Sequence, residues 1–453
     1  MALFGLGQAR SPEERRERSL VRKIDSLVLS YVCLIYWTNY LDRTNFSNAY
    51  VSGMKEATNM TGDDFNNANT CFQVGYLVGM VPNNIALLKI RPRYWLSFTA
   101  LAWGVLVLSL YRTTSPQQIY VIRFFQALFE SSTFSGTQLI LGSWYKETEL
   151  TKRTAVFTSS GLVGSIFSGF MQSAIYKNLN GKSGLAGWQW LFIIDFLITL
   201  PIVIYGFVFF PDMPQYSKTL VFSEKDRSIA RNRLGRTPQM PKLSWAIVKR
   251  VLGQWHWYGF SWLWAIGGLV EAFGTSSMFA LWLENRGYPV ADRNNYPLGI
   301  YAVGIVATFA ISFYIDVTGA TKHWHAAWVI GVVMFVSAVL MLARPFDPVT
   351  VFVAQYLSGV SFAGQATYFA WCNVVCKNDL EERAIVLSSM NMWSSVFWAW
   401  WNIVFYKASD APTWTRGQGA MIATAVVTAI SATGLRYLQV REKHRRMPNL
   451  LTE

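Results

Sequence analysis

Long apolar stretches recur along nearly the whole length of this 453-residue chain. A helix needs about 20 consecutive, mainly apolar residues to cross the hydrocarbon core of a bilayer. Stretches of about that length lie near residues 26–48, 70–90, 94–112, 117–140, 154–176, 188–210, 257–283, 297–316, 323–343, 349–371, 384–407 and 417–440. The sequence therefore predicts an all-α polytopic membrane protein with twelve transmembrane helices.

The composition supports the membrane class. Charged residues make up 15% of the chain and hydrophobic residues 52%, whereas an ordinary soluble protein is roughly 25% charged. The N-terminus opens on a charged segment, from Arg10 to Lys23, that runs directly into the first apolar stretch. We therefore expect no cleavable signal peptide here.

The net charge of +14 indicates orientation rather than a nucleic-acid partner. Basic residues gather in both tails and in the connections after the second, fourth and sixth stretches, all on one side of a twelve-span topology. The positive-inside rule then places both termini and the long central loop in the cytoplasm. No basic patch belongs to a folded soluble domain, so nucleic acid is not an expected partner. The sequon at Asn59 falls on the predicted outer side, where Asn59 would be a glycosylation site.

The chain divides into two halves of six spans. Residues 211–256 are polar and carry both charge signs, which is typical of a linker with some amphipathic helix. Phe157-Thr-Ser-Ser160 and Leu387-Ser-Ser389 follow similar charged loops about 230 residues apart, as expected for a six-plus-six duplication with the substrate site between the halves. The predicted parts are a cytoplasmic tail (1–25), an N-terminal half (26–210), a cytoplasmic linker (211–256), a C-terminal half (257–440) and a cytoplasmic tail (441–453).

Polar residues inside the spans mark candidate functional positions. Asp42 and Arg43 lie at the outer end of the first span and are expected to form an ion pair. Ionisable groups at that depth are costly unless they face the interior or a water-filled cavity. A second set shares one helix face, because its members are three or four residues apart: Arg123, Gln126, Glu130, Thr133 and Thr137. The two stripes predict a pathway for a solute and protons.

Other intramembrane groups are less decisive. Glu271 in the seventh span has Thr275 one turn on and is either functional or a structural partner of the other half. Asp195 in the sixth span is expected to be structural. Helical spacing allows further residues to line a cavity: Gln365, Tyr368, Asn391, Ser394 and Trp398.

The cysteines and histidines give no sign of a metal site. Cys33 and Cys71 lie within spans, and Cys372 and Cys376 are one turn apart with no histidine or further cysteine to complete a zinc set. They are predicted to be buried thiols. The four histidines fall at loop or helix ends without matching ligands, which argues against a membrane-embedded enzyme: His256, His323, His325 and His444.

The sequence favours a gradient as the energy source. The run Gly181-Lys-Ser183 has Tyr176 where a P-loop needs a glycine, so no ATP site is visible. Moving one charge through the membrane is worth about 2.3 kcal/mol per 100 mV. A buried carboxylate can bind the coupling proton, and Asp42 and Glu130 fit that role. No cofactor is expected.

Three motifs resemble the anion:cation symporter branch of the major facilitator superfamily: Asp42-Arg43-x-Asn45-x-x-x-Ala49, the segment from Arg123 to Glu130, and Gly187-Trp-Gln-Trp190. Longer phrases, such as Asn48 to Glu56 and Glu149 to Arg153, are similar to fungal permeases for vitamins and small acids. Pantothenate permeases are the nearest resemblance, with biotin, nicotinate, allantoate and sulfonate carriers as relatives. The superfamily motif after the second span departs at 83–93, which keeps the basic residues but lacks the usual acid. A partial copy follows the eighth span at Asp316, Gly319 and Lys322.

The resemblance implies a transporter that imports a small carboxylate by proton symport and alternating access. It implies proton coupling by Asp42 and Glu130 and binding of the substrate carboxylate by Arg43. The full predicted binding set is Arg43, Asn39, Arg123, Gln126, Glu271, Gln365, Tyr368 and Asn391. The expected partners are an organic anion, protons and the lipid bilayer, with a monomer in the plasma membrane. One alternative is a carrier of another substrate, such as biotin, nicotinate, allantoate or a sulfonate. The other is a nutrient sensor or receptor on a transporter scaffold, although the tails here are short for signalling partners.

Overall fold

The computed structural model describes residues 12–145, 147–214, 217, 222–233, 245–275, 277–318, 321–376 and 379–446. Within those ranges every regular element is a helix. Parts of the predicted linker (215–216, 218–221, 234–244), the ends of both tails and Gly319 of the partial motif lie outside the described residues.

The N-terminal bundle consists of six long rods. They are α2 (Ser30–Ala49) with a π-helical turn at each end, α4 (Asp64–Lys89), α5 (Pro92–Ser109), α6 and α7 in succession (Pro116–Glu130 and Ser132–Trp144), α8 (Glu147–Leu179) and α9 (Gly187–Val208). A short helix, α3 (Lys55–Ala57), follows α2. Each rod coincides with one predicted span.

The C-terminal bundle repeats this pattern with more interruptions. Its rods are α12, α13 and α14 (Trp255–Leu269, Ala272–Thr275, Met278–Asn285), α15 and α16 (Val290–Asn295, Leu298–Val317), α17 (His323–Ala343), α18 and α19 (Pro348–Ser358, Ala363–Val375), α20 (Leu380–Phe405) and α21 (Thr415–Arg446). The predicted count of twelve spans is therefore confirmed, and α8 and α21 extend beyond the predicted ends.

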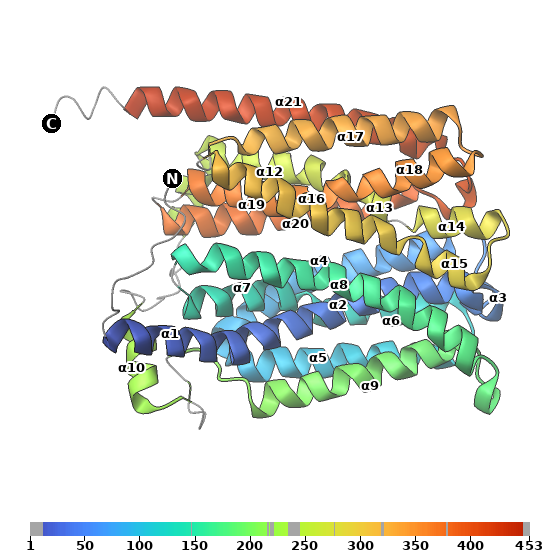
Figure 1. Cartoon of the computed structure of the whole chain (residues 1–453), viewed down its shortest axis with the longest axis horizontal. Coiled ribbons are helices and arrows are strands. Elements are labelled where there is room, and N and C mark those ends of the chain that lie inside the picture. Colours follow the sequence, from blue (N-terminus) through green and yellow to red (C-terminus); the bar gives the residue numbers. More distant parts are fainter. Residues whose placement is uncertain are drawn as a thin grey trace.

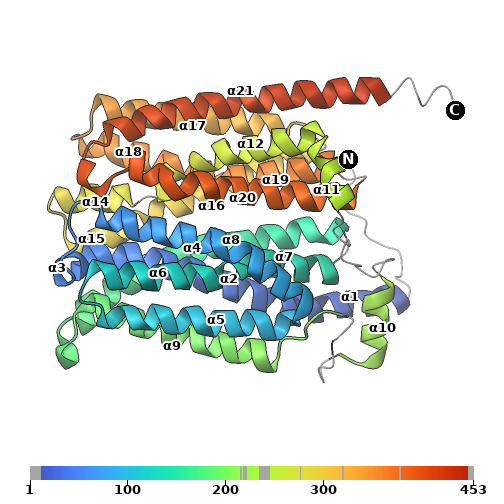
Figure 2. The same ribbon diagram turned by 180° about the vertical axis from the view of Figure 1, so that it is seen from behind.

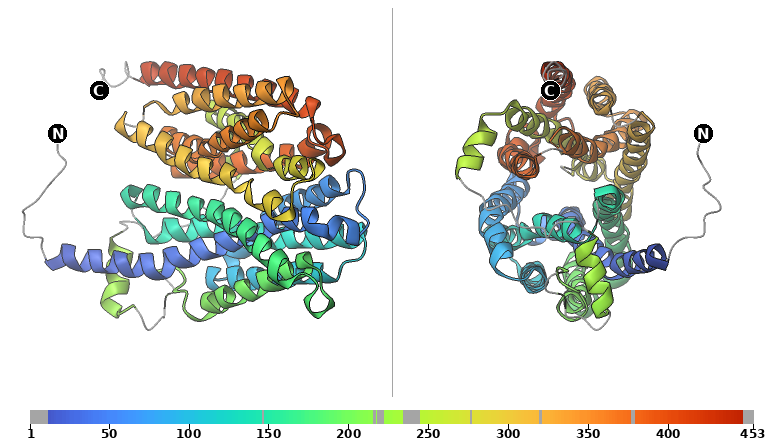
Figure 3. Two further views of the ribbon diagram at one scale, coloured as in Figure 1. Left: turned by 45° about the vertical axis from the view of Figure 1, so that its right-hand side comes forward. Right: turned by 90° about the vertical axis from the view of Figure 1, so that its left-hand side faces the viewer.

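The rods lie roughly parallel to the long axis of the molecule (Figure 1). The N-terminal bundle, blue to green, and the C-terminal bundle, yellow to red, lie beside each other in the front, back and end views (Figures 1, 2 and 3). The start of α1 (Pro12–Ile24) and the end of α21, the first and last described helices, are at the same end (Figure 1). We call it the linker end, because α10 (Glu224–Asn232) and α11 (Trp245–Leu252) lie there too (Figure 2).

The outer surface of the bundles is apolar, as a lipid-facing surface must be. Phe313 and Val349 are each 71% exposed, and Val121 and Phe170 are also well exposed. By length and composition alone, five helices in the described part are apolar enough to cross a membrane. Other rods, such as α2 and α6, carry the polar residues that face the interior.

Small residues allow close packing inside the N-terminal bundle. A Cβ at Gly164 of α8 would collide with the carbonyl oxygen of Trp37 in α2, and one at Gly75 of α4 would collide with that of Phe124 in α6. Backbones that approach this closely are typical of helix contacts in membranes. The close packing of α8 on α2 and of α4 on α6 fixes these helices with their polar faces toward the middle of the molecule.

Polar contacts between the two bundles gather at the end remote from the termini. The Asn66 amide donates to the carbonyl oxygens of Tyr406 (2.8 Å) and Asn402 (3.2 Å). The hydroxyls of Ser47 and Ser277 are 2.7 Å apart, and the Asn294 amide donates to Ser52 (3.2 Å). The bundles are thus joined at this end.

At the linker end, two short helices each attach to one bundle. Lys23, in the tail helix α1 (Pro12–Ile24), forms an ion pair of 2.8 Å with Asp226 of α10. Arg250 of α11 pairs with Asp379 (2.8 Å) and Glu381 (3.2 Å) at the start of α20. α10 is therefore held by the helix that leads into α2, and α11 by the C-terminal bundle.

Candidate functional site

A cavity of about 280 Å³ lies between the bundles and is lined by side chains of both. This is close to the lower end of the range of about 300–1,000 Å³ for small-molecule sites. Its N-terminal wall includes the predicted residues Asn39, Arg43 and Arg123. Its C-terminal wall includes Glu271, Gln365, Asn391, Ser394 and Trp398. The structure thus brings together residues from spans that are far apart in the sequence.

Arg43 forms an ion pair with Glu130, not with Asp42. Its Nε lies 3.2 Å from Glu130 Oε2, and the same oxygen accepts a hydrogen bond from the Asn39 amide at 2.9 Å. The other oxygen accepts from the Gln126 amide at 2.7 Å. The expected pairing of Asp42 with Arg43 is wrong, because consecutive residues of a helix point to different faces.

Glu130 is fully buried behind the cavity wall. A buried carboxylate is stable only when it is paired and hydrogen-bonded. Arg43, Asn39 and Gln126 all donate to Glu130 and meet that need. Glu130 in turn holds Arg43 in place, and Gln126 holds Glu130. Neither lines the cavity itself.

Arg123 is a buried cation in the cavity wall. Its guanidinium carbon lies 4.5 Å from the ring centre of Phe46 and 4.2 Å from that of Phe72, between two aromatic faces. It donates to Gln126 (3.2 Å) and Asn69 (3.3 Å), both of which are neutral. Among the described residues, no carboxylate lies within ion-pair distance of it. An uncompensated buried charge is costly, and an anion in the cavity would compensate this one.

Two further predicted residues, Asp42 and Tyr368, also do not line the cavity. Asp42 is buried within the N-terminal bundle, where it faces Asp195 of α9. Tyr368 is buried against Trp264 and Gly267 of α12, and its hydroxyl has no hydrogen-bond partner.

Glu271 is the carboxylate of the C-terminal wall. It occupies the turn between α12 and α13, and its Oε1 has no hydrogen-bond partner. Thr275 bonds the backbone carbonyl of Glu271 at 2.8 Å and leaves the carboxylate free for a ligand.

The sequence reasoning missed a polar stripe on α4. Asn66, Asn69, Gln73 and Tyr76 all line the cavity. Their spacing of three, four and three residues is the same helical signal that marked the stripe in α6. The Tyr76 ring also lies 5.1 Å from the Arg43 guanidinium carbon. The helical spacing of these residues could have predicted the stripe from the sequence. The search started from charged residues, and this stripe holds none.

Asn59 lies outside the cavity region, in the loop between α3 and α4. It is exposed, and its φ of 54° places it in the left-handed region that asparagine tolerates. Glycosylation at Asn59 stays a prediction.

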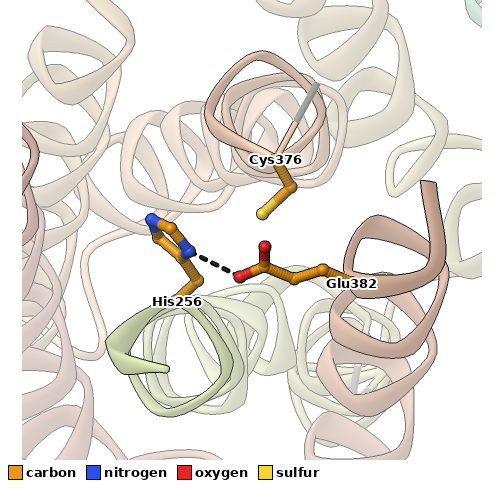
Figure 4. A group of neighbouring side chains, drawn as sticks. All are labelled: His256, Cys376 and Glu382. Atoms are coloured by element: carbon orange, nitrogen blue, oxygen red, sulfur yellow. Dashed lines mark hydrogen bonds and ion pairs between the residues drawn. The ribbon is translucent and has the colours of Figure 1, made fainter. Parts of the chain in front are cut away.

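A separate cluster at the linker end joins α12, α20 and α21 beside the end of α19. His256 Nδ1 lies 2.6 Å from Glu382 Oε1, with Cys376 beside them (Figure 4). The other ring nitrogen, Nε2, lies 3.0 Å from Glu442 Oε2 of α21. Cys376 and His256 thus have neighbours that their sequence spacing did not reveal, because helices distant in the sequence meet here. Two ligands of a tetrahedral zinc ion with bonds of about 2.0–2.1 Å lie about 3.3 Å apart. The shorter contact to Glu382 is that of a hydrogen bond, so we describe the group as the histidine clasp.

The family model of the Major Facilitator Superfamily matches residues 32–401. The chain belongs to the major facilitator superfamily. The predicted family is thereby confirmed, and the protein is a twelve-helix membrane transporter of this superfamily rather than an enzyme.

Two yeast relatives cover most of the chain. A pantothenate transporter of Saccharomyces cerevisiae is 52% identical over 435 residues, which are 94% of this chain and 85% of that protein. A pantothenate transporter of Schizosaccharomyces pombe is 37% identical over 428 residues, which are 94% of this chain and 83% of that protein.

Solved structures of other superfamily members share the fold. A bacterial homologue of the human lysosomal transporter Spinster, in an inward-facing and unoccupied conformation, has a TM-score of 0.65 at 14% identity, over 92% of this chain and 97% of that one. A D-xylose–proton symporter has a TM-score of 0.60 at 11% identity, over 89% and 97%.

Proposed function

We propose that this superfamily transporter imports pantothenate, a small carboxylate, together with protons. The observation that carries the proposal is Arg123, a buried cation in the cavity wall with no carboxylate partner among the described residues. A carboxylate in the cavity would supply the missing negative charge. The two relatives named as pantothenate transporters support this choice of substrate.

In this proposal the two arginines share the substrate carboxylate. Arg123 faces the cavity from α6, and Arg43 faces it from α2 while Glu130 holds its Nε. The planar guanidinium group suits bidentate binding of a carboxylate. Asn39 and Gln126 orient these groups, and Glu271, Gln365 and Asn391 contact the rest of the molecule. Proton coupling is assigned to buried acids of the N-terminal bundle, where the sequence predicts Asp42 and Glu130.

The proposed orientation places both termini and the linker in the cytoplasm of a monomer in the plasma membrane. The charge bias of the loops supports it. Because the bundles are joined at the end remote from the termini, the structure would then be closed to the outside. The inward-facing state is the one expected after substrate has crossed the membrane.

The test uses purified protein in lipid vesicles with labelled pantothenate and an imposed pH gradient. We expect saturable uptake that is faster with an acidic exterior, and weak competition by the carboxamide analogue, which carries no anion. Protein-free vesicles are the control. The absence of saturable uptake under every gradient would contradict the proposal and favour the sensor.

A further inference from the structure

We propose that Asp42 and Asp195 form one proton-binding pair inside the N-terminal bundle, off the substrate cavity, and that the coupled proton binds there. The sequence had assigned Asp195 a structural role. The inference rests on the proposed function, since it concerns how the same transporter couples uptake to protons.

The two carboxyl groups face each other from α2 and α9 in a dry environment. Asp42 is 2% exposed and Asp195 is fully buried, and each lies within hydrogen-bonding reach of the other. Both oxygens of Asp42 and Oδ1 of Asp195 receive no hydrogen bond from a donor group. Two carboxylates this close cannot both be charged, because like charges in a low-dielectric site repel each other strongly. At least one proton must therefore reside on the pair.

The other groups that face the pair do not remove this requirement. From α6, the charges of Glu130 and Arg123 act at longer range and oppose each other. From α5, the indole N–H of Trp103 approaches Asp42 but does not reach hydrogen-bond geometry. From α2 itself, the Asn45 amide donates to Asp195 Oδ2 at 2.6 Å. That hydrogen bond marks Asp195 as the charged member and Asp42 as the protonated one.

Glu130 is a poorer proton carrier in this conformation. Arg43, Asn39 and Gln126 all donate to it, and a protonated carboxyl would have to surrender part of that acceptor capacity. Its hydrogen bonds therefore suit the charged form, whereas those of Asp42 suit a carboxylic acid. We assign the charged role to Glu130 and the exchange of protons to the pair.

A chain of hydrogen bonds links the pair to the cavity. Asn45 donates to Asp195 and accepts from the hydroxyl of Ser168 in α8. The Ser168 hydroxyl in turn accepts from the Asn48 amide at 2.7 Å, and Asn48 lines the cavity. The polar path from acid to cavity therefore has no gap.

This chain can run in two directions. With Asp195 charged, the Asn45 amide N–H₂ points toward the acid. If Asp195 gains the coupled proton it becomes a donor, so the amide must turn its oxygen toward the acid and its N–H₂ toward Ser168. A single proton thus selects between two discrete arrangements that end at the cavity wall.

The same segment of α8 contacts the other bundle. Gly169, the residue after Ser168, packs against Leu298 and the carbonyl oxygen of Asn294, and Ser173 donates to Asn295 at 2.7 Å. These contacts belong to the end where the bundles are joined. A change at Ser168 is therefore one residue away from the contact that must open when the transporter turns outward.

The test compares Asp195→Asn, Asp195→Glu and the control Asp212→Asn in vesicles. Asp212 is also a buried aspartate, just beyond the end of α9, at a φ of 63° that asparagine tolerates. Two readouts are needed: accumulation driven by a pH gradient, and exchange of labelled for unlabelled substrate at equal pH. The proposal takes one coupled proton for each substrate, so a one-unit gradient should give the parent and the Asp212→Asn variant about tenfold accumulation.

For Asp195→Asn we expect the gradient-driven accumulation to disappear while exchange continues, since exchange needs no net proton movement. Asp195→Glu should restore accumulation with a displaced pH profile. Accumulation by Asp195→Asn with the parent's pH dependence would overturn the proposal. If that variant does not fold, Asp195→Glu decides, and an unchanged pH profile would overturn it. Failure of the proposed function differs from all of these, because the parent itself would then show no uptake.

Discussion

The two bundles share a six-rod plan but place their buried charges differently. In the N-terminal bundle, Asp42, Arg43, Arg123, Glu130 and Asp195 lie in or behind the wall of the cavity. In the described part of the C-terminal bundle, Glu271 is the acid of that wall, and the histidine clasp lies at the linker end. Most of the buried ionisable groups around the cavity thus belong to the N-terminal bundle, whereas the C-terminal wall is mainly uncharged apart from Glu271.

The energetics explain why this asymmetry is informative. A buried ion pair adds little net stability, yet removing one partner costs about 3–5 kcal/mol because the other charge is left uncompensated. Five ionisable groups in one half are therefore hard to explain by stability alone. The histidine clasp joins helices near the linker and does not touch the cavity. Its role is therefore better explained as holding the helices together.

The largest effect is expected where the two bundles must separate. In a background in which the four native cysteines are replaced, Ser47→Cys with Ser277→Cys should form a disulfide, because the two hydroxyls are only 2.7 Å apart. Cross-linking should reduce uptake to background, and a reductant should restore it. Each single cysteine variant serves as the control. Full uptake by quantitatively cross-linked protein would show that the bundles need not part here.

The next effect tests charge recognition by the N-terminal wall. Arg123→Lys keeps the charge but loses the planar group that fits between Phe46 and Phe72. We expect the KM for pantothenate to rise by about 10- to 100-fold, which corresponds to the roughly 1–3 kcal/mol of a desolvated cation–aromatic and bidentate contact. Initial uptake rates over a range of substrate concentrations measure it.

Arg436→Lys, in the C-terminal bundle, is the matched control for that experiment, since Arg436 bonds only Gln439 at 3.1 Å among the described contacts. Equal increases in KM for Arg123→Lys and Arg436→Lys would show that Arg123 has no special part in binding the substrate.

A smaller effect on the KM is expected from a change in the C-terminal wall of the cavity. Glu271→Gln keeps the shape of a cavity-lining group and should change the KM only a few-fold, about 1 kcal/mol for a single hydrogen bond. Accumulation driven by the pH gradient should persist. Loss of that accumulation would place a proton site in the C-terminal bundle and break the comparison.

The smallest effect on transport should come from the histidine clasp. His256→Gln should leave the KM unchanged and lower the melting temperature by a few degrees, because charge-assisted hydrogen bonds contribute about 1.5–3 kcal/mol. Thermal unfolding in detergent measures this, with the exposed His444→Gln as control. A changed KM with unchanged melting would mean that the clasp acts on the cavity.

The sequence predicted the spans well because length and hydropathy are local properties. The pairings could not be predicted in the same way. Arg43 pairs with Glu130 of another helix and not with its neighbour Asp42. Adjacent residues of a helix point in different directions, so Asp42 cannot reach it. His256 and Cys376 meet only after α12 and α19 pack together. Asp195 looked structural because nothing in its own span showed that Asp42 would face it.

The attachments of α10 and α11 have a mechanical consequence. One linker helix is tied by Lys23 to the rod of the first bundle, and the other by Arg250 to the start of α20. If the bundles rock against each other, α10 must move with the N-terminal bundle and α11 with the C-terminal bundle. The two linker helices must then change their positions relative to each other in every transport cycle, although neither of them touches the cavity.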